Sequence, residues 1–176
     1  MCNEMILVNT VKDHLRHKKT LVKLIDDFES LHDTRVLSDV ENISSDWEMP
    51  KEAKKEYLEY FFNNVISETM DSISQTLGLS SWTAHDAWYQ RYSEQGTHGW
   101  HNHGKTQFAN SYFLELPDST YKTEIVGSNG EIIEYDAKEG DVVTFPAWLK
   151  HRSKPNGKER KTIIAFNSSF GLGKND

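Results

Sequence analysis

The apolar residues in the first half of the chain recur at helical spacing. Within residues 20–31 they stand three or four positions apart, which places them on one face of a helix: Leu21, Leu24, Ile25, Phe28 and Leu31. A longer stripe of the same kind follows Pro50 and ends before Gly78, and a proline in the first turn with a glycine after the last is typical of a helix. Residues 33–49 have no clear period, so we interpret them as a loop with room for a short strand.

After Gly78 the pattern changes to short aromatic and β-branched runs separated by Gly, Pro, Asn and Asp, which is typical of strands and turns. Ser128-Asn129-Gly130 predicts a tight hairpin, because Asn-Gly tolerates the positive φ angles of such a turn. Gly140-Asp141 and residues 155–157 predict two further turns. The strands that we expect are residues 83–92, 99–103, 108–116, 121–126, 131–135, 141–145, 150–154 and 161–168.

About eight short strands behind two helices predict a mainly β fold, a double-sheet jelly roll of the cupin-like, double-stranded β-helix type. In this interpretation residues 1–80 are a mostly helical buttress and residues 81–170 are the jelly-roll core. A chain of 176 residues fits one domain, so we expect residues 1–176 to fold together.

Charge and cysteine content exclude several classes of function. The 27 acidic and 20 basic residues give a net charge of -7, which disfavours binding to nucleic acid or to anionic membranes. Cys2 is the only cysteine, so the chain forms no internal disulfide. The sequence has no apolar segment of membrane-spanning length. We therefore expect a soluble, cytoplasmic protein, of an oligomeric state that the sequence does not indicate.

Three histidines form a candidate metal site. His101 and His103 are two residues apart, so on an extended segment both imidazoles point to one face. His151 comes from a remote strand, and strands two and seven of a jelly roll face each other across its mouth. Neutral imidazole binds iron, zinc, copper and nickel alike, so the set predicts a metal without its identity. The alternative is that these histidines are hydrogen-bonded groups of the surface or core, with His98 at the rim of the pocket.

A second candidate constellation follows the third histidine. On a strand Arg160 and Thr162 share a face, where a guanidinium beside a hydroxyl is a good receptor for a carboxylate. The alternative is a solvated edge, since Lys158, Glu159 and Lys161 crowd the same turn. Tyr112, on the predicted third strand, either donates its hydroxyl to a bound acid or is an ordinary core aromatic.

Together these residues resemble the iron(II)- and 2-oxoglutarate-dependent oxygenases, in the branch close to prolyl-hydroxylase-like proteins. The resemblance covers residues 82–170, and its most specific element is the ordered set of a first His, a distal His and a following Arg with a hydroxyl residue two positions on. The segments that carry it are residues 87–92, Trp100-His101-Asn102-His103, residues 112–117, residues 140–146, His151 and Arg160-Lys161-Thr162.

The resemblance implies roles for individual residues. His101 and His151 would bind Fe(II), and Arg160 with Thr162 would hold the distal carboxylate of 2-oxoglutarate, with Tyr112 assisting. The family usually has Asp or Glu where this chain has His103, so the usual two-histidine, one-carboxylate triad would become three histidines and leave the iron one unit more positive. In the alternative, His103 turns away and water fills the position.

The reaction that the resemblance implies is oxidative decarboxylation of 2-oxoglutarate by dioxygen to succinate and carbon dioxide, coupled to hydroxylation of a peptide or small-molecule substrate. A second hypothesis is a three-histidine cupin-type dioxygenase or lyase that does not use 2-oxoglutarate. A third is a non-catalytic, ligand-binding jelly roll whose histidines hold structural zinc or no metal.

Overall fold

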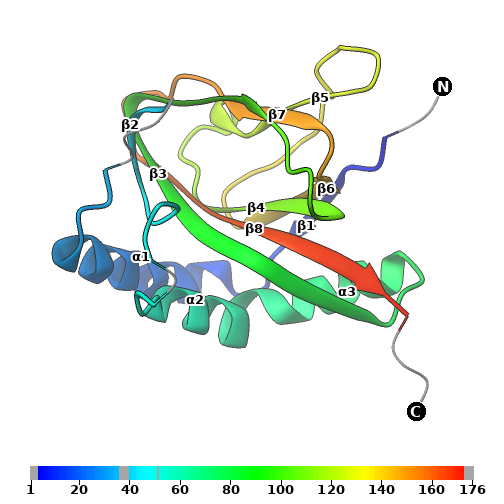
Figure 1. Cartoon of the computed structure of the whole chain (residues 1–176), viewed down its shortest axis with the longest axis horizontal. Coiled ribbons are helices and arrows are strands. Elements are labelled where there is room, and N and C mark those ends of the chain that lie inside the picture. Colours follow the sequence, from blue (N-terminus) through cyan, green and yellow to red (C-terminus); the bar gives the residue numbers. More distant parts are fainter. Residues whose placement is uncertain (1–3, 36–39, 51, 173–176) are drawn as a thin grey trace.

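The structure is a computed structural model that describes residues 4–35, 40–50 and 52–172. Its described strands form one curled, antiparallel sheet in the order β1-β6-β4-β8-β3-β7-β5, with β2 paired to β3 (Figure 1). This architecture confirms the predicted jelly roll. The strands are β1 Leu7–Thr10, β2 Val40–Ser45, β3 Ser81–His101, β4 Phe108–Glu115, β5 Glu124–Val126, β6 Asp141–Pro146, β7 Lys150–Ser153 and β8 Lys161–Gly171.

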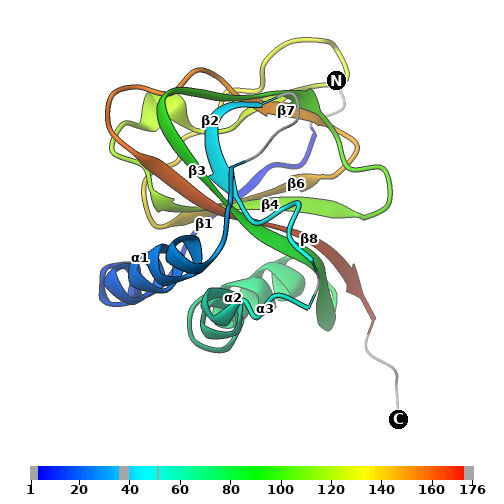
Figure 2. The ribbon, with the colours of Figure 1, turned by 60° about the vertical axis from the view of Figure 1, so that its left-hand side comes forward.

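The helices pack against one face of this sheet (Figure 2). They are α1 His14–Leu31, α2 Glu56–Phe61, a π-helical turn Phe62–Ile66 and α3 Ser67–Thr76, and a short 3-10 turn Ser119–Tyr121 precedes β5. Both predicted helices are present but begin elsewhere: α1 begins at His14 and not near residue 20, and the second helix begins at Glu56, so Pro50 precedes it and is not in its first turn. None of the described helices is long and apolar enough to cross a membrane.

The strand prediction needs three corrections. Residues 83–92 and 99–101 belong to one long strand, β3, whose pairing shifts between Ala84 and Ala87 and between His98 and His101, and residues 102–103 follow the end of this strand. Residues 131–135 form only an isolated bridge, Val126 to Ile132, after a turn in which Gly130 has a φ of +82°. Strand β1 is additional to the prediction for residues 1–80, whereas β2 agrees with the short strand allowed within residues 33–49. That residues 1–176 form a single domain stays a prediction.

Strand β8 separates two cores, because successive side chains of a strand point to opposite faces. Ile164 and Phe166 pack with the helices, whereas Ile163 and Ala165 pack inside the curl of the sheet. Even-numbered residues of β8 therefore point towards the helices, and odd-numbered residues point into the interior of the curled sheet. This alternation determines which of the candidate residues can reach the histidines.

Candidate metal centre

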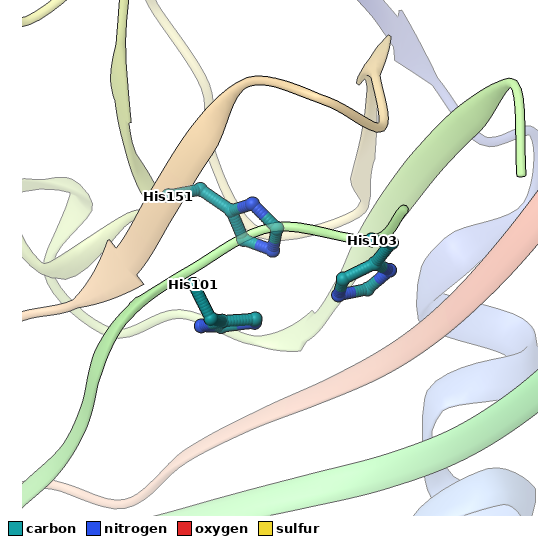
Figure 3. A group of neighbouring side chains, drawn as sticks. All are labelled: His101, His103 and His151. Atoms are coloured by element: carbon teal, nitrogen blue, oxygen red, sulfur yellow. The ribbon is translucent and has the colours of Figure 1, made fainter. Parts of the chain in front are cut away.

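The three histidines of the candidate metal site meet in space, as predicted. His101, at the end of β3, lies opposite His151 of β7, and the backbone N–H of His103 donates to the Ala147 carbonyl at 2.8 Å. The ring centroids are 4.2 Å apart for His101 and His151 and 5.0 Å apart for His103 and His151 (Figure 3). Their candidate ligand nitrogens all lie within 4.8 Å of one another. The arrangement is suited to a single metal ion.

The hydrogen bonds of the three rings leave the same nitrogen free on each. Each Nδ1 faces an oxygen acceptor: Gly99 O for His101 at 2.9 Å, Leu149 O for His151 at 3.1 Å, and Asn167 Oδ1 for His103 at 2.5 Å. Because such oxygens only accept, Nδ1 carries the proton and Nε2 keeps its lone pair. The Nε2 of His103 is buried and has no partner within the described part of the chain. The three rings are therefore oriented as metal-binding histidines are.

The electrostatic environment keeps the imidazoles neutral. Burial, reinforced by the neighbouring His101 and His103, lowers the pKa of His151 to about 3. Burial also lowers the pKa of His101. A fourth ring, His98, stacks on His101 at 4.0 Å, and burial lowers its pKa to about 4. Neutral imidazole is the form that binds metal, so the site is ready for an ion at neutral pH without losing protons.

The structure does not bring Arg160, Thr162 and Tyr112 to the histidines. The Arg160 guanidinium donates twice to the Glu115 carboxylate, at 2.9 and 2.8 Å, and the Thr162 hydroxyl donates to the same group at 2.5 Å. The Tyr112 hydroxyl is hydrogen-bonded to His14 of α1 at 2.6 Å. All three side chains thus lie on the helix-facing side of the sheet. In this structure the three side chains are bonded to Glu115 and His14, and their role in holding a carboxylate stays a prediction.

Lys161 is a basic side chain that lies inside the curl of the sheet. It is only 2% exposed, and its Nζ donates to the Tyr121 carbonyl at 2.9 Å and to the Ser153 hydroxyl. Nζ also lies 4.0 Å from the centroid of the Tyr92 ring. Ser153 follows His151 by two residues on β7, so it shares the face of His151 about 7 Å further along. Lys161 therefore places an amine on the same inner face as the histidines.

Burial lowers the pKa of Lys161 to about 7, and the nearby Lys154 contributes to this shift. An amine with this pKa gains a proton readily when an anion arrives beside it. Sequence reasoning placed Lys161 at the start of the strand 161–168 and named its side chain only in the alternative of a solvated edge. Strand alternation places Lys161 on the face of Ile163 and Ala165, but Ile164 and Phe166 on the other face are equally apolar, so the sequence alone does not indicate which face is the inner one.

Asn167 is a second residue that sequence reasoning missed. It is 8% exposed and shares the inner face of β8 with Lys161, and its Oδ1 accepts the Nδ1–H of His103 at 2.5 Å. Such partners fix the orientation of a metal-binding histidine and increase its basicity. Asn167 is therefore a positioning residue for His103.

We expect Asn167→Ala to weaken Fe(II) binding by roughly 10- to 100-fold, because His103 loses the partner that orients it. Titration of the purified protein with Fe(II) under anaerobic conditions measures the effect. Asn167→Asp keeps an acceptor at the same place and should restore the affinity. Equal affinity of the alanine variant and the unmodified protein would contradict the positioning role.

Comparisons with known proteins give a match at the level of structure. No family model and no curated protein sequence matches the chain. A viral collagen prolyl hydroxylase from Paramecium Bursaria Chlorella virus-1, solved as a 2-oxoglutarate complex, superposes with a TM-score of 0.60 at 14% identity, over 97% of this chain and 98% of its own.

Two further solved structures agree over most of this chain. A prolyl hydroxylase from Trichoplax adhaerens, in complex with a hypoxia inducible factor peptide, gives a TM-score of 0.62 at 14% identity, over 94% of this chain and 84% of that one. HygX from Streptomyces hygroscopicus, with nickel and 2-oxoglutarate bound, gives a TM-score of 0.64 at 9% identity, over 97% of this chain and 84% of that one. At such low identity the likeness concerns the fold: this chain has the jelly-roll fold of prolyl hydroxylases and other 2-oxoglutarate-binding proteins.

Proposed function

We propose that this protein is a non-haem iron(II)- and 2-oxoglutarate-dependent dioxygenase with a three-histidine metal centre. One observation carries the proposal: the free Nε2 atoms of His101, His103 and His151 converge on the same inner face as the buried amine of Lys161. A metal site that shares an inner face with an amine able to take up a proton suits a ligand that chelates a metal at one end and carries a carboxylate at the other. The fold, and the 2-oxoglutarate bound in two of the similar structures, support the same conclusion.

In this proposal the three histidines hold Fe(II) through Nε2, and protonated Lys161 binds the distal carboxylate of 2-oxoglutarate. With iron bound, the site would supply the reaction R–H + 2-oxoglutarate + O2 → R–OH + succinate + CO2. The protein positions the reactants and keeps water out. The aromatic rings of Trp88 and Phe145, 5% and 0% exposed, pack beside His103 and His151 and close the inner side of the centre.

The substrate that we propose is a peptide or a small molecule. The Trichoplax adhaerens enzyme is described with a peptide bound, and HygX with 2-oxoglutarate and nickel, so this fold serves more than one kind of ligand. Dioxygen is the second reactant of the proposed chemistry.

A three-histidine cupin-type dioxygenase that does not use 2-oxoglutarate is the second candidate. The observation that favours it is His103 itself, an imidazole in place of the carboxylate of the common facial triad. Lys161 favours the first candidate, because a buried amine in the interior suits an anionic ligand, and 2-oxoglutarate is the anion bound in two of the similar structures. A non-catalytic jelly roll is the third candidate, and it predicts a protein that consumes no oxygen.

Anaerobic reconstitution with Fe(II) tests the proposal. Addition of 2-oxoglutarate should produce a weak visible charge-transfer band, and admission of air should then give succinate. Omission of either iron or 2-oxoglutarate should abolish succinate formation. Oxygen uptake with iron alone would favour the cupin-type candidate, and absence of both the band and oxygen uptake would favour the non-catalytic one.

A further inference from the structure

A cleft of about 540 Å³ opens beside the metal centre. One wall comes from residues 46–50, directly after β2, which are tied to β3 by a hydrogen bond of 3.0 Å from the Tyr89 backbone N–H to Asp46. The other wall is the bulged first part of β3. The cleft is lined by Trp47, Met49, Lys55, His85, Asp86, Ala87, Trp88 and Asn167. We call it the Trp47 cleft.

The Trp47 cleft adjoins the metal centre directly. Asn167 lines it and is hydrogen-bonded to His103, and the Trp88 ring lies 5.8 Å from the His103 ring. A molecule in the cleft therefore lies next to one of the proposed iron ligands. Its volume is within the range of pockets that bind small molecules or single side chains. These features are those expected of the site for the primary substrate.

Two indole rings form a corner in the cleft. The centroids of Trp47 and Trp88 are 4.4 Å apart and their planes are perpendicular. Trp47 is 56% exposed although it packs on a buried ring, so a large part of its surface is open to a ligand. The face of a tryptophan attracts organic cations more strongly than that of any other side chain.

The charges of the cleft also favour a cation. Lys55 is neutralised, because its Nζ is 2.9 Å from the carboxylate of Asp46, which is fully buried. His85 is hydrogen-bonded to the Ser169 hydroxyl at 2.7 Å. Asp86 is exposed and has no hydrogen-bond or ion-pair partner among the residues that the structure describes. An unpaired carboxylate thus remains beside the aromatic corner, in a protein of net charge -7.

We propose that the Trp47 cleft binds a positively charged group of the primary substrate, an alkyl ammonium or a guanidinium, between the indole of Trp47 and the carboxylate of Asp86. The inference deepens the proposed function and rests on it, since the occupant is the molecule to be hydroxylated. A lysine or arginine side chain fits this description: its cationic end would be held in the cleft while its aliphatic carbons extend towards the metal centre.

Binding of small probes tests this proposal independently of turnover. The probes are N-acetyl-lysine N-methylamide, the arginine equivalent and the neutral norleucine equivalent, which has the lysine chain without the amine. The chain has five tryptophans, so its indole N–H signals can be followed one by one in ¹H–¹⁵N NMR spectra, with Trp47→Phe to assign the signal of Trp47. The cationic probes should shift the Trp47 and Trp88 signals and bind at least about 10-fold more tightly than the norleucine probe. Comparison of lysine and arginine distinguishes ammonium from guanidinium.

Asp86→Asn should reduce the affinity for the cationic probes about 10-fold and leave that for the norleucine probe unchanged. Asp136→Asn, at another exposed aspartate outside the cleft, is the matched control and should change neither. Equal binding of lysine and norleucine probes, an Asp86→Asn variant with unchanged preference, or no binding at all would overturn the proposal. Charge-selective binding to a protein that forms no succinate would instead support the cleft and reject the oxygenase assignment.

Discussion

A Lys161→Met variant is expected to lose 2-oxoglutarate binding and to keep its Fe(II) site. Methionine is similar in length to lysine and apolar, so it fills the same interior space without a charge. The distal carboxylate of 2-oxoglutarate would then be buried without a partner, and truncation of one member of a buried charge pair typically costs several kcal/mol. We expect the affinity for 2-oxoglutarate to fall by roughly 100-fold or more. Fe(II) affinity should change little, because Lys161 bonds to Tyr121 and Ser153 rather than to a histidine.

The same variant has a signature in the stability of the ligand-free protein. Burial lowers the pKa of Lys161 to about 7, whereas a lysine of the unfolded chain titrates near 10.4. Between these values the unfolded state binds more protons than the folded state, so the free energy of unfolding should rise with pH. Below pH 7 both states are protonated and the full cost of burying the charge remains. Lys161→Met should abolish this rise and be more stable than the unmodified protein at pH 6.

Titration with 2-oxoglutarate in the presence of Fe(II), and denaturant unfolding at pH 6 to 10, measure the two effects. Arg160→Ala is the matched control. Because Arg160 lies on the opposite face of the sheet and bonds to Glu115, its loss should leave 2-oxoglutarate affinity nearly unchanged. Strong loss of 2-oxoglutarate binding in Arg160→Ala, with normal binding in Lys161→Met, would reverse the assignment of the two residues.

The meeting of the histidines was predictable from the sequence, because side chains two residues apart on an extended segment point to the same face. His101 and His103 had to share a face on any extended segment, and a jelly roll brings a remote strand to the same mouth. The structure adds that β3 and β7 pair with His101 directly opposite His151. The hydrogen bond that orients His103 was not predictable, because its partner Asn167 lies on a third strand whose register the sequence does not reveal.

The predicted carboxylate receptor shows which question the sequence leaves open, namely which face of β8 points inward. Successive side chains of a strand alternate between its two faces, so Lys161 lies on one face and Arg160 and Thr162 lie on the other. The sequence does not indicate which of these faces points inward, because both faces of β8 are buried. Ile163 and Ile164 are equally apolar, and each packs in a different core. The decision comes from tertiary packing: α1 covers the face of Thr162, where Arg91 lies within 3.4 Å of its hydroxyl and bonds to Asp26 of the helix at 2.8 Å. A single strand with two buried faces carries no sequence signal for its inner side.

Replacement of His103 by alanine is expected to have the largest effect on the metal centre. It leaves two protein ligands, and Nε2 of His103 is a buried atom with no other partner among the described residues. Loss of one ligand of three should weaken Fe(II) binding by about 100-fold or more, since even loss of a residue that merely orients a ligand costs 10- to 100-fold. Anaerobic Fe(II) titration measures this loss, and the charge-transfer band with 2-oxoglutarate should disappear at iron concentrations that saturate the unmodified protein.

His103→Asp separates ligation from packing. A carboxylate at this position would restore the common facial triad and make the iron centre one unit less positive. The variant should therefore bind Fe(II) but hold the dianionic 2-oxoglutarate more weakly than the three-histidine site does, because the attraction between cosubstrate and metal centre falls. His98→Ala is the control: His98 stacks on His101 at 4.0 Å but lies outside the group of three, so its removal should change Fe(II) affinity only a few-fold. If His103→Ala retained the Fe(II) affinity of the unmodified protein, His103 would not be a ligand, and water would have to fill the third position.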